Sequence, residues 1–284
     1  MTTNDVANDM ALNLIDLERY PIENLDSGKG AEFLGRCQEH MEAHGWCSFD
    51  GFIHADALTA LTAESNELLG SAEKLTIKRT IYQKEADSSA NSDDIREQEL
   101  VHHATQLASD QIPPDSLLQQ LYQSDLLTDF VRRVQGKEVL YRCADEFQAL
   151  NVVALLPDNW HAWHYDTTEC TVTMLLQAAD SGGEFVFLPN SRTDDWEDRE
   201  AVERLLSGDM SKAESFGRGA GTFTMFRGGY SLHGVTKVEG SQPRVTAILT
   251  YDEEPNRTLS DDVNIRIYGD RVKKILAERK AAAS

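Results

Sequence analysis

Hydrophobic residues recur at helical spacing through much of the first half of the chain. Residues 30–44 and 54–69 carry apolar side chains three or four positions apart, and each stretch ends near a glycine, at Gly45 and Gly70. Two prolines and an aspartate then open a further helical run. Its apolar positions are Leu117, Leu118, Leu121, Leu126 and Val131. The pattern therefore predicts helices here, and a terminal helix over residues 269–283.

The second half of the chain changes to runs of β-branched and apolar residues. Residues 169–176 and 243–251 each read as a buried strand, and residues 221–235 read as a strand, a glycine turn and the start of another strand. Residues 194–216 are charged and helical in pattern, which indicates an insertion between strands. We expect a β-rich core from about residue 139 to residue 253.

Two histidines and an aspartate near the predicted strand ends form a candidate metal site. In an extended chain, residues two positions apart point to the same side, so His164 and Asp166 can face one ion while Tyr165 points away. His233 follows the glycine turn and lies at the start of a predicted strand, free to face the first pair. Two imidazoles and one carboxylate on one face of a metal are typical of non-heme Fe(II) oxygenases.

An arginine follows these residues at the start of the next predicted strand. Arg244 comes just before the apolar run that ends at Tyr251, a position where its side chain can be buried. A buried guanidinium needs a carboxylate partner, because an unpaired charge in the interior is very costly. The strand offers no acidic residue, so a bound diacid is a good candidate.

Each of these features has a simpler explanation when taken alone. A His-x-Asp tripeptide occurs by chance, and a single histidine in a strand is more often a hydrogen-bonded core residue than a ligand. Arg244 alone could be a surface residue of an edge strand. The ordered set of His164, Asp166, His233 and Arg244 favours the metal site.

These residues resemble the Fe(II)/2-oxoglutarate-dependent oxygenase superfamily. Residues 75–270 carry the resemblance, which is closest to the group of free-amino-acid hydroxylases and radical halogenases. It implies an α+β fold with a double-stranded β-helix core (jelly-roll, cupin-like) and flanking helices. It also implies Fe(II), 2-oxoglutarate and O2 as cofactor and cosubstrates, with His164, Asp166 and His233 as metal ligands. Arg244, helped by Thr246, would hold the far carboxylate of 2-oxoglutarate. The supporting stretches are residues 149–152, 163–166, 173–177, 182–185, 231–235 and 243–244.

Asp166 separates two chemistries within this group. Halogenases of this kind resemble the hydroxylases but have glycine or alanine in place of the carboxylate ligand, which leaves a coordination position for chloride. This chain has aspartate there. The resemblance therefore implies hydroxylation of an unactivated C–H bond in a small substrate, such as a free and basic amino acid or a derivative.

Three residues are candidates for contact with the substrate, two of them from the same resemblance. His161 and Glu146 resemble positions that contact the amino acid in the family, and Arg79 could pair with a substrate carboxylate. Each could equally be an ordinary solvated side chain. Thr167 stands where the lysine-acting relative offers an acid, so lysine itself is in doubt as the substrate.

Composition narrows the partners. The chain has 284 residues, 40% hydrophobic content and a formal net charge of −21, which argues against nucleic acid as a partner. No apolar run is long enough to cross a membrane, and the first residues do not resemble a secretory signal, so we expect a cytoplasmic protein. The four cysteines form no C-x-x-C pair. The oligomeric state is open.

We expect one structural domain in two parts. Residues 1–138 would form an N-terminal helical region packed on the core, after an irregular leader over residues 1–27 and with a polar loop at residues 85–97. Residues 139–284 would form the oxygenase core with its helical insertion and terminal helix. Two other functions remain open, a jelly-roll protein that binds a metal without turnover and a hydroxylase of protein side chains.

Overall fold

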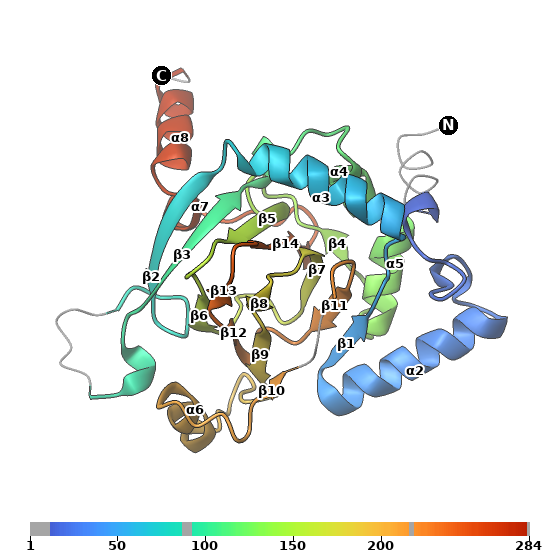
Figure 1. Ribbon diagram of the computed structural model, residues 1–284, viewed down its shortest axis with the longest axis horizontal. Helices are drawn as coiled ribbons and strands as arrows, with labels where there is room; N and C mark the ends of the chain where they lie inside the picture. Colours follow the sequence, from blue (N-terminus) through green and yellow to red (C-terminus); the bar gives the residue numbers. More distant parts are fainter. Residues whose placement is uncertain (1–11, 87–92, 216–218, 283–284) are drawn as a thin grey trace.

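Two antiparallel sheets face each other across the middle of the molecule (Figure 1). The computed structural model describes residues 12–86, 93–215 and 219–282. The large sheet has seven strands in the order β1 (Trp46–Phe49), β11 (Phe223–Phe226), β7 (Thr171–Gln177), β14 (Arg244–Leu249), β5 (Leu150–Leu155), β3 (Leu100–Leu107) and β2 (Glu73–Arg79).

The small sheet has four strands. Their order is β10 (Glu214–Ser215), β9 (Phe185–Leu188), β12 (Leu232–Val235) and β6 (His161–His164). Two further sheets have two strands each. One pairs β13 (Val238–Glu239) with β8 (Ser181–Gly182), and the other pairs β15 (Tyr251–Asp252) with β4 (Tyr141–Arg142). The chain passes between the facing sheets several times, which is the arrangement of a double-stranded β-helix.

The large sheet has an apolar outer face. Helices α2 (Gly28–His44), α3 (Ala55–Leu69), α4 (Leu117–Tyr122) and α5 (Asp125–Val134) cover it and share one hydrophobic cluster with it. Strand β14 contributes Val245, Ala247 and Leu249 to this cluster. Successive side chains in a strand point to opposite faces, so Arg244, Thr246 and Ile248 lie on the inner face, toward the small sheet.

The inner face mixes apolar and polar side chains. Its apolar part, which includes Val153, Leu155 and Phe226, packs against Phe185 and Phe187 of the small sheet. Residues directly opposite each other in paired strands share a face. By the registers of the strands, the polar inner-face residues include Thr224, Thr171, Thr173, Thr246, Arg244, Asn151, Gln106, His102 and Arg79.

The predicted helices are largely present. α2 ends at Gly45, whose φ of 78° is left-handed, and α3 ends at Leu69 as the spacing predicted. The single helical run predicted after Pro113 is wrong in one respect, because it is broken into α4 and α5. Ser124 causes the break: its side chain accepts a hydrogen bond from the backbone N–H of Leu127 and caps a new helix.

The insertion and the C-terminus differ in detail from the prediction. Residues 194–216 hold only one helix, α6 (Arg199–Leu206), which packs on the outside of the small sheet, and residue 216 lies outside the described residues. The terminal helix is present as α8 (Asp270–Ala282), and α7 (Asp261–Tyr268) precedes it. Three short 3₁₀ helices complete the elements: η1 (Ile22–Asn24), η2 (Ile95–Glu97) and η3 (Ser109–Gln111).

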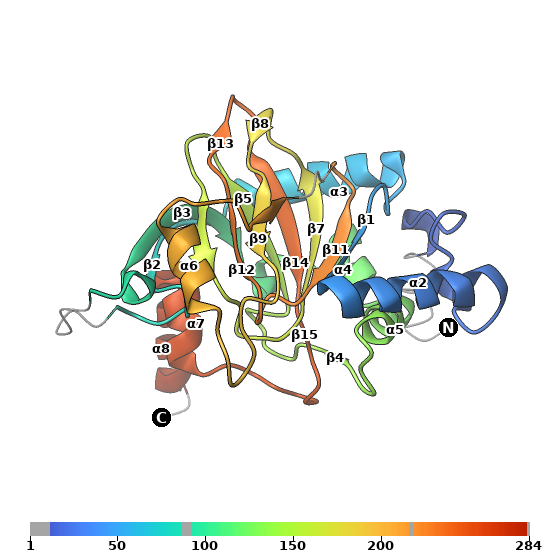
Figure 2. The same cartoon turned by 90° about the horizontal axis from the view of Figure 1, so that it is seen from below.

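The region before residue 139 is not purely helical. It provides β1, β2 and β3, which pair within the large sheet alongside strands from the predicted core (Figure 2). The division of the chain at residue 138 stays a prediction. The predicted polar loop is described only in part, since residues 87–92 lie outside the described residues, as do residues 1–11 of the predicted leader. In the part of the chain that the structure describes, no helix is both long and apolar enough to cross a membrane.

Candidate active site

The structure brings the three predicted metal ligands together at the inner side of the small sheet. His164 ends β6 and pairs with His233 of β12, so both imidazoles face the same way. Asp166 follows β6 by two residues. One of its carboxylate oxygens lies 3.4 Å from Nε2 of His164 and the other 3.4 Å from Nε2 of His233. One potential ligand atom from each residue lies within 4.8 Å of the other two.

Backbone carbonyls fix the orientation of both imidazoles. Nδ1 of His164 lies 2.8 Å from the carbonyl oxygen of Ala162, and Nδ1 of His233 lies 2.8 Å from that of Ser231. A carbonyl can only accept, so each Nδ1 must carry the proton and donate it. Each Nε2 then presents a lone pair to the shared space. Burial, and then the neighbouring His164, lowers the pKa of His233 to about 4, which keeps that ring neutral and able to bind a metal.

Asp166 is held from two sides. Its carboxylate accepts a hydrogen bond from the hydroxyl of Thr171, and its backbone N–H donates to the carbonyl of Gly228 at 3.0 Å. A Cβ on Gly228 would stand 2.2 Å from the carboxylate, so only glycine fits beside it. Burial alone would raise the pKa of Asp166, but His233, His164 and Thr171 together hold it below the usual range. The carboxylate is therefore ionised and ready for a cation.

Arg244 lies on the inner face of the large sheet, 5% exposed. Its guanidinium donates a hydrogen bond to the hydroxyl of Thr246, and among the described residues no carboxylate forms an ion pair with it. Burial lowers the pKa of Arg244 to about 10, and it remains charged at neutral pH. A charged and unpaired guanidinium inside a fold costs free energy that an anionic ligand would recover, and its fork geometry suits a carboxylate. The residues present thus fit both a divalent metal and a diacid.

A row of imidazole rings leads from the metal ligands to the large sheet. The ring of His161 lies 4.4 Å from the ring of His164 and 4.4 Å from the ring of His102, measured between centroids. His102 lies on β3 and is 6% exposed, and among the described residues neither of its ring nitrogens has a hydrogen-bond partner. Burial lowers the pKa of His102 to about 3, and the other groups that lower it are His164, Arg79 and His103, all basic.

His102 was missed in the sequence because its signal is not local. The alternating exposure of Val101, His102, His103 and Ala104 is visible only when the strand is known, and the contact of His102 with His161 joins opposite sheets. Arg79, predicted from the sequence, acts on the pKa of both imidazoles and hydrogen-bonds the neutral side chain of Gln83. The structure therefore places His161 next to the metal ligand His164 and His102 next to His161, with Arg79 close enough to lower the pKa of both.

Glu146 lies elsewhere. Its side chain is half-exposed and forms an ion pair with Arg279 of α8, on the surface of the protein. It precedes the end of β5 at Leu150, whereas Arg244 pairs with the opposite end of that strand, at Leu155. The structure does not bring Glu146 together with the other candidates, and its substrate role stays a prediction.

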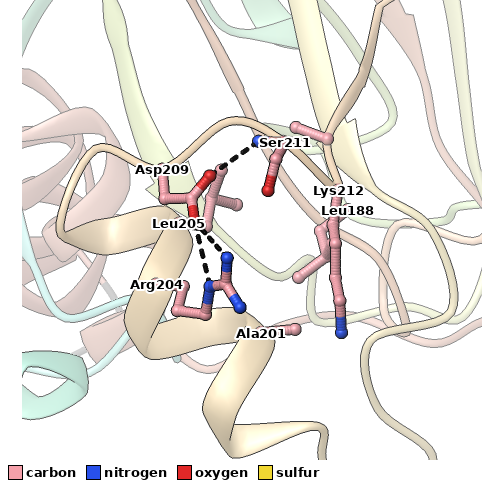
Figure 3. Close-up of a pocket in the computed structure, with 8 residues that line it drawn as sticks. Leu188, Ala201, Arg204, Leu205, Asp209, Ser211 and Lys212 are labelled. Carbon is pink, nitrogen blue, oxygen red and sulfur yellow. Dashed lines mark hydrogen bonds and ion pairs between the residues drawn. The ribbon is translucent and has the colours of Figure 1, made fainter.

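The pocket drawn in Figure 3 lies apart from these residues. It is lined by α6 and the turn after it, where Arg204 forms an ion pair with Asp209 at 2.6 Å. The space has no room for a water molecule, and Leu188 of β9 also lines it.

Comparison with known proteins identifies the family and the fold. Residues 30–268 match the sequence model of the family described as Halogenase D. No curated protein sequence matches the chain. This family match confirms the predicted resemblance to the oxygenase group that includes the radical halogenases. The predicted α+β fold with a jelly-roll core is confirmed by solved structures that share it.

Three solved structures illustrate the likeness. The non-heme α-ketoglutarate-dependent epimerase SnoN from nogalamycin biosynthesis is 16% identical, covering 78% of this chain and 82% of that one, with a TM-score of 0.57. HygX from Streptomyces hygroscopicus, solved with nickel, 2-oxoglutarate and hygromycin B, is 12% identical, covering 78% and 88%, with a TM-score of 0.51. A 2OG-Fe(II) oxygenase family protein from Burkholderia pseudomallei is 15% identical, covering 81% and 92%, with a TM-score of 0.50. At these identities the likeness concerns the fold alone.

Proposed function

Because the chain belongs to the Halogenase D family, we propose that it is an Fe(II)- and 2-oxoglutarate-dependent hydroxylase of a small molecule, with a free amino acid or a derivative as the substrate. His164, Asp166 and His233 would hold the metal, and Arg244 with Thr246 would hold the far carboxylate of 2-oxoglutarate. When bound, iron with 2-oxoglutarate and O2 supplies an oxidant strong enough to cleave an unactivated C–H bond, with succinate and carbon dioxide as coproducts.

The ligand geometry is the observation that carries the proposal. Two Nε2 lone pairs and one carboxylate meet at a single point, and both imidazoles are held in the metal-binding tautomer by backbone carbonyls. Three protein ligands on one face leave the other positions for cosubstrate and O2. A structural metal site would instead be closed by a fourth protein ligand, and the described residues that come together offer only three.

Asp166 favours hydroxylation over halogenation. In halogenases that resemble this group, glycine or alanine at this position leaves room for chloride. Here the Asp166 carboxylate faces both imidazoles at 3.4 Å and is held by Thr171, so a protein oxygen occupies that place. This chain thus belongs to a family described as halogenases, and its own ligand set favours hydroxylation.

The residues next to the triad favour an anionic group on the substrate. This region contains one cation, Arg79, and two imidazoles whose pKa values are lowered, His161 and His102. The charged groups that lower the pKa of each imidazole are all basic. The carboxylate of an amino acid would accept hydrogen bonds from these side chains and neutralise Arg79. Thr167, the residue after Asp166, is exposed and carries no charge for a substrate ammonium group, so the identity of the amino acid stays open.

Succinate formation tests the proposed function directly. Purified protein would be incubated with Fe(II), 2-oxoglutarate, O2 and the free amino acids one at a time, and succinate would be measured against a reaction without an amino acid. We expect at least one amino acid to stimulate succinate formation. Stimulation by peptides and not by free amino acids would favour a hydroxylase of protein side chains. No succinate under any condition would favour a metal-binding protein without turnover.

A further inference from the structure

Tyr165, the residue between two of the proposed ligands, points away from the metal site. Its ring is 1% exposed and packs in a cluster with Leu188, Leu232 and α6 on the outer side of the small sheet. Its backbone N–H donates to the carbonyl of Ile81 at 2.8 Å, and its hydroxyl lies 3.0 Å from Oγ of Ser191. The position of this ring therefore determines where the peptide that joins His164 to Asp166 can lie.

Arg192 lies against this ring. The carbon at the centre of its guanidinium is 3.9 Å from the centroid of the Tyr165 ring, a close cation–π contact. Nearby arginines such as Arg96 and Arg204 form ion pairs with carboxylates, but among the described residues no carboxylate forms an ion pair with Arg192. Its position is set by the ring and by backbone carbonyls.

Those carbonyls belong to the glycine turn that touches Asp166. Nε of Arg192 donates to the carbonyl of Gly229 at 2.5 Å, and its backbone N–H donates to the carbonyl of Tyr230 at 3.1 Å. Gly228, the other glycine of the turn, accepts the backbone N–H of Asp166 and lies against its carboxylate. Arg192 thus contacts both neighbours of Asp166, namely Tyr165 along the chain and the glycine turn across it.

A second aromatic ring stabilises the far side of this arrangement. The ring of Tyr82 is nearly parallel to that of Tyr165, with an interplanar angle of 11° and 6.0 Å between centroids. Its hydroxyl donates to the carboxylate of Glu197 at 2.9 Å, and Arg96 donates to the same carboxylate at 2.6 Å. Arg192 and Glu197 form an isolated β-bridge, so the segment that carries Arg192 is fixed to the same network.

We propose that Arg192 is a positioning residue, which fixes the Asp166 carboxylate as a metal ligand by holding the Tyr165 ring and the Gly228–Gly229 turn at the same time. This inference rests on the proposed metal site. Residues that orient a ligand from behind typically contribute tenfold or more to metal affinity. Without Arg192 the turn and the ring can separate, and the carboxylate loses its fixed direction toward the two imidazoles.

Co(II) binding tests the proposal without any need for turnover. The ligand-field absorption of Co(II) depends on the number and kind of ligands, so titration of the purified protein gives both affinity and coordination. We expect Arg192→Met, which removes the charge and the Nε donor at similar length, to weaken Co(II) binding by about tenfold or more and to change the spectrum at saturation. Arg192→Lys keeps a charge near the ring but loses the forked donor, and its effect should be intermediate.

Arg199→Met is the matched control. Arg199 is an exposed arginine of the insertion that begins two residues after Arg192; its side chain is 65% accessible, and its partner is Asp94. This variant should bind Co(II) with wild-type affinity and spectrum. If Arg192→Met does not fold by circular dichroism, Arg192→Lys carries the test. A lower unfolding temperature with unchanged Co(II) affinity and spectrum would make Arg192 merely structural and overturn the proposal. If wild-type protein binds no Co(II) at the triad, the metal site itself fails, and with it the proposed function.

Discussion

The two faces of the large sheet are built from the same strands but have different roles. On β14, Val245, Ala247 and Leu249 enter the outer hydrophobic cluster beneath the helices. The alternate residues of that strand, Arg244 and Thr246, point inward toward the small sheet. The outer face is packed as a protein core is packed, whereas the inner face buries a charge without a carboxylate partner.

Within a single strand, the residues on the outer face therefore contribute to stability and those on the inner face to function. Burying an unpaired guanidinium and an imidazole without hydrogen bonds, as at Arg244 and His102, costs free energy of folding. The outer face offsets that cost through its apolar burial. Ligands that satisfy the inner groups would then recover the cost on binding, which is the usual trade between stability and activity at a site.

The largest effect is expected from the inner side at His233. His233→Ala removes one of three protein ligands, so turnover should fall below detection and Fe(II) binding should weaken. The fold should persist, because Nδ1 of the ring hydrogen-bonds the carbonyl of Ser231, Nε2 faces the carboxylate of Asp166, and the ring is not part of the outer cluster. Succinate formation, Fe(II) binding and circular dichroism check these points. Wild-type turnover in this variant would remove His233 from the site.

Arg244→Leu should uncouple affinity from stability. It leaves a carboxylate of 2-oxoglutarate unpaired, a loss of roughly 2 to 5 kcal/mol in binding free energy, which is about 30-fold to several thousandfold in affinity. The unfolding temperature of the ligand-free protein should stay the same or rise, since an unpaired buried charge is removed. Calorimetric titration with 2-oxoglutarate and thermal unfolding measure the two effects. An unchanged affinity would mean that another residue anchors the cosubstrate.

Leu249→Ala, on the opposite face of the same strand, should lower stability and leave the affinity for 2-oxoglutarate unchanged. Leu249 is 1% exposed in the outer cluster, and its truncation should lower the free energy of unfolding by about 2 to 5 kcal/mol. The affinity for 2-oxoglutarate should not change while the protein is folded. Urea unfolding and the same titration provide the test. A large loss of cosubstrate affinity here would show that the two faces are not independent.

The smallest effect is expected at His102. Replacement by phenylalanine keeps an aromatic ring next to His161 but removes the nitrogens, so KM for the stimulating amino acid should rise by roughly 3- to 10-fold, the value of one hydrogen bond. His103→Phe is the matched control, since His103 is the exposed neighbour that faces Thr76. Equal KM values for His102→Phe and wild-type protein would exclude His102 from substrate binding.

The sequence predicted the local parts of this arrangement well. The spacing of His164 and Asp166 needs only the period of an extended chain, and the β14 pattern needs only its run of apolar residues. The strands β2 and β3 were missed because exposed residues recur along both of them, which gives a weak signal, and β2 is also the edge strand of the sheet. Their assignment to a helical region followed from the helices on either side.

The contacts that the sequence did not predict join distant residues. The pairing of Glu146 with Arg279 joins positions 133 residues apart, and the contact of His102 with His161 joins two sheets. Arg192 is 26 residues from Asp166 and acts on it through Tyr165 and the glycine turn. Such contacts depend on how strands pack, and no local pattern specifies them.

The product of wild-type turnover in the presence of chloride tests the central claim most directly. Protein with Fe(II), 2-oxoglutarate, the stimulating amino acid and excess sodium chloride would react under ¹⁸O2, and the product would be analysed by mass spectrometry. Because the Asp166 carboxylate stands where halide would otherwise bind, the account predicts an amino acid heavier by one ¹⁸O atom and no chlorinated product. A dominant chlorinated product would contradict it.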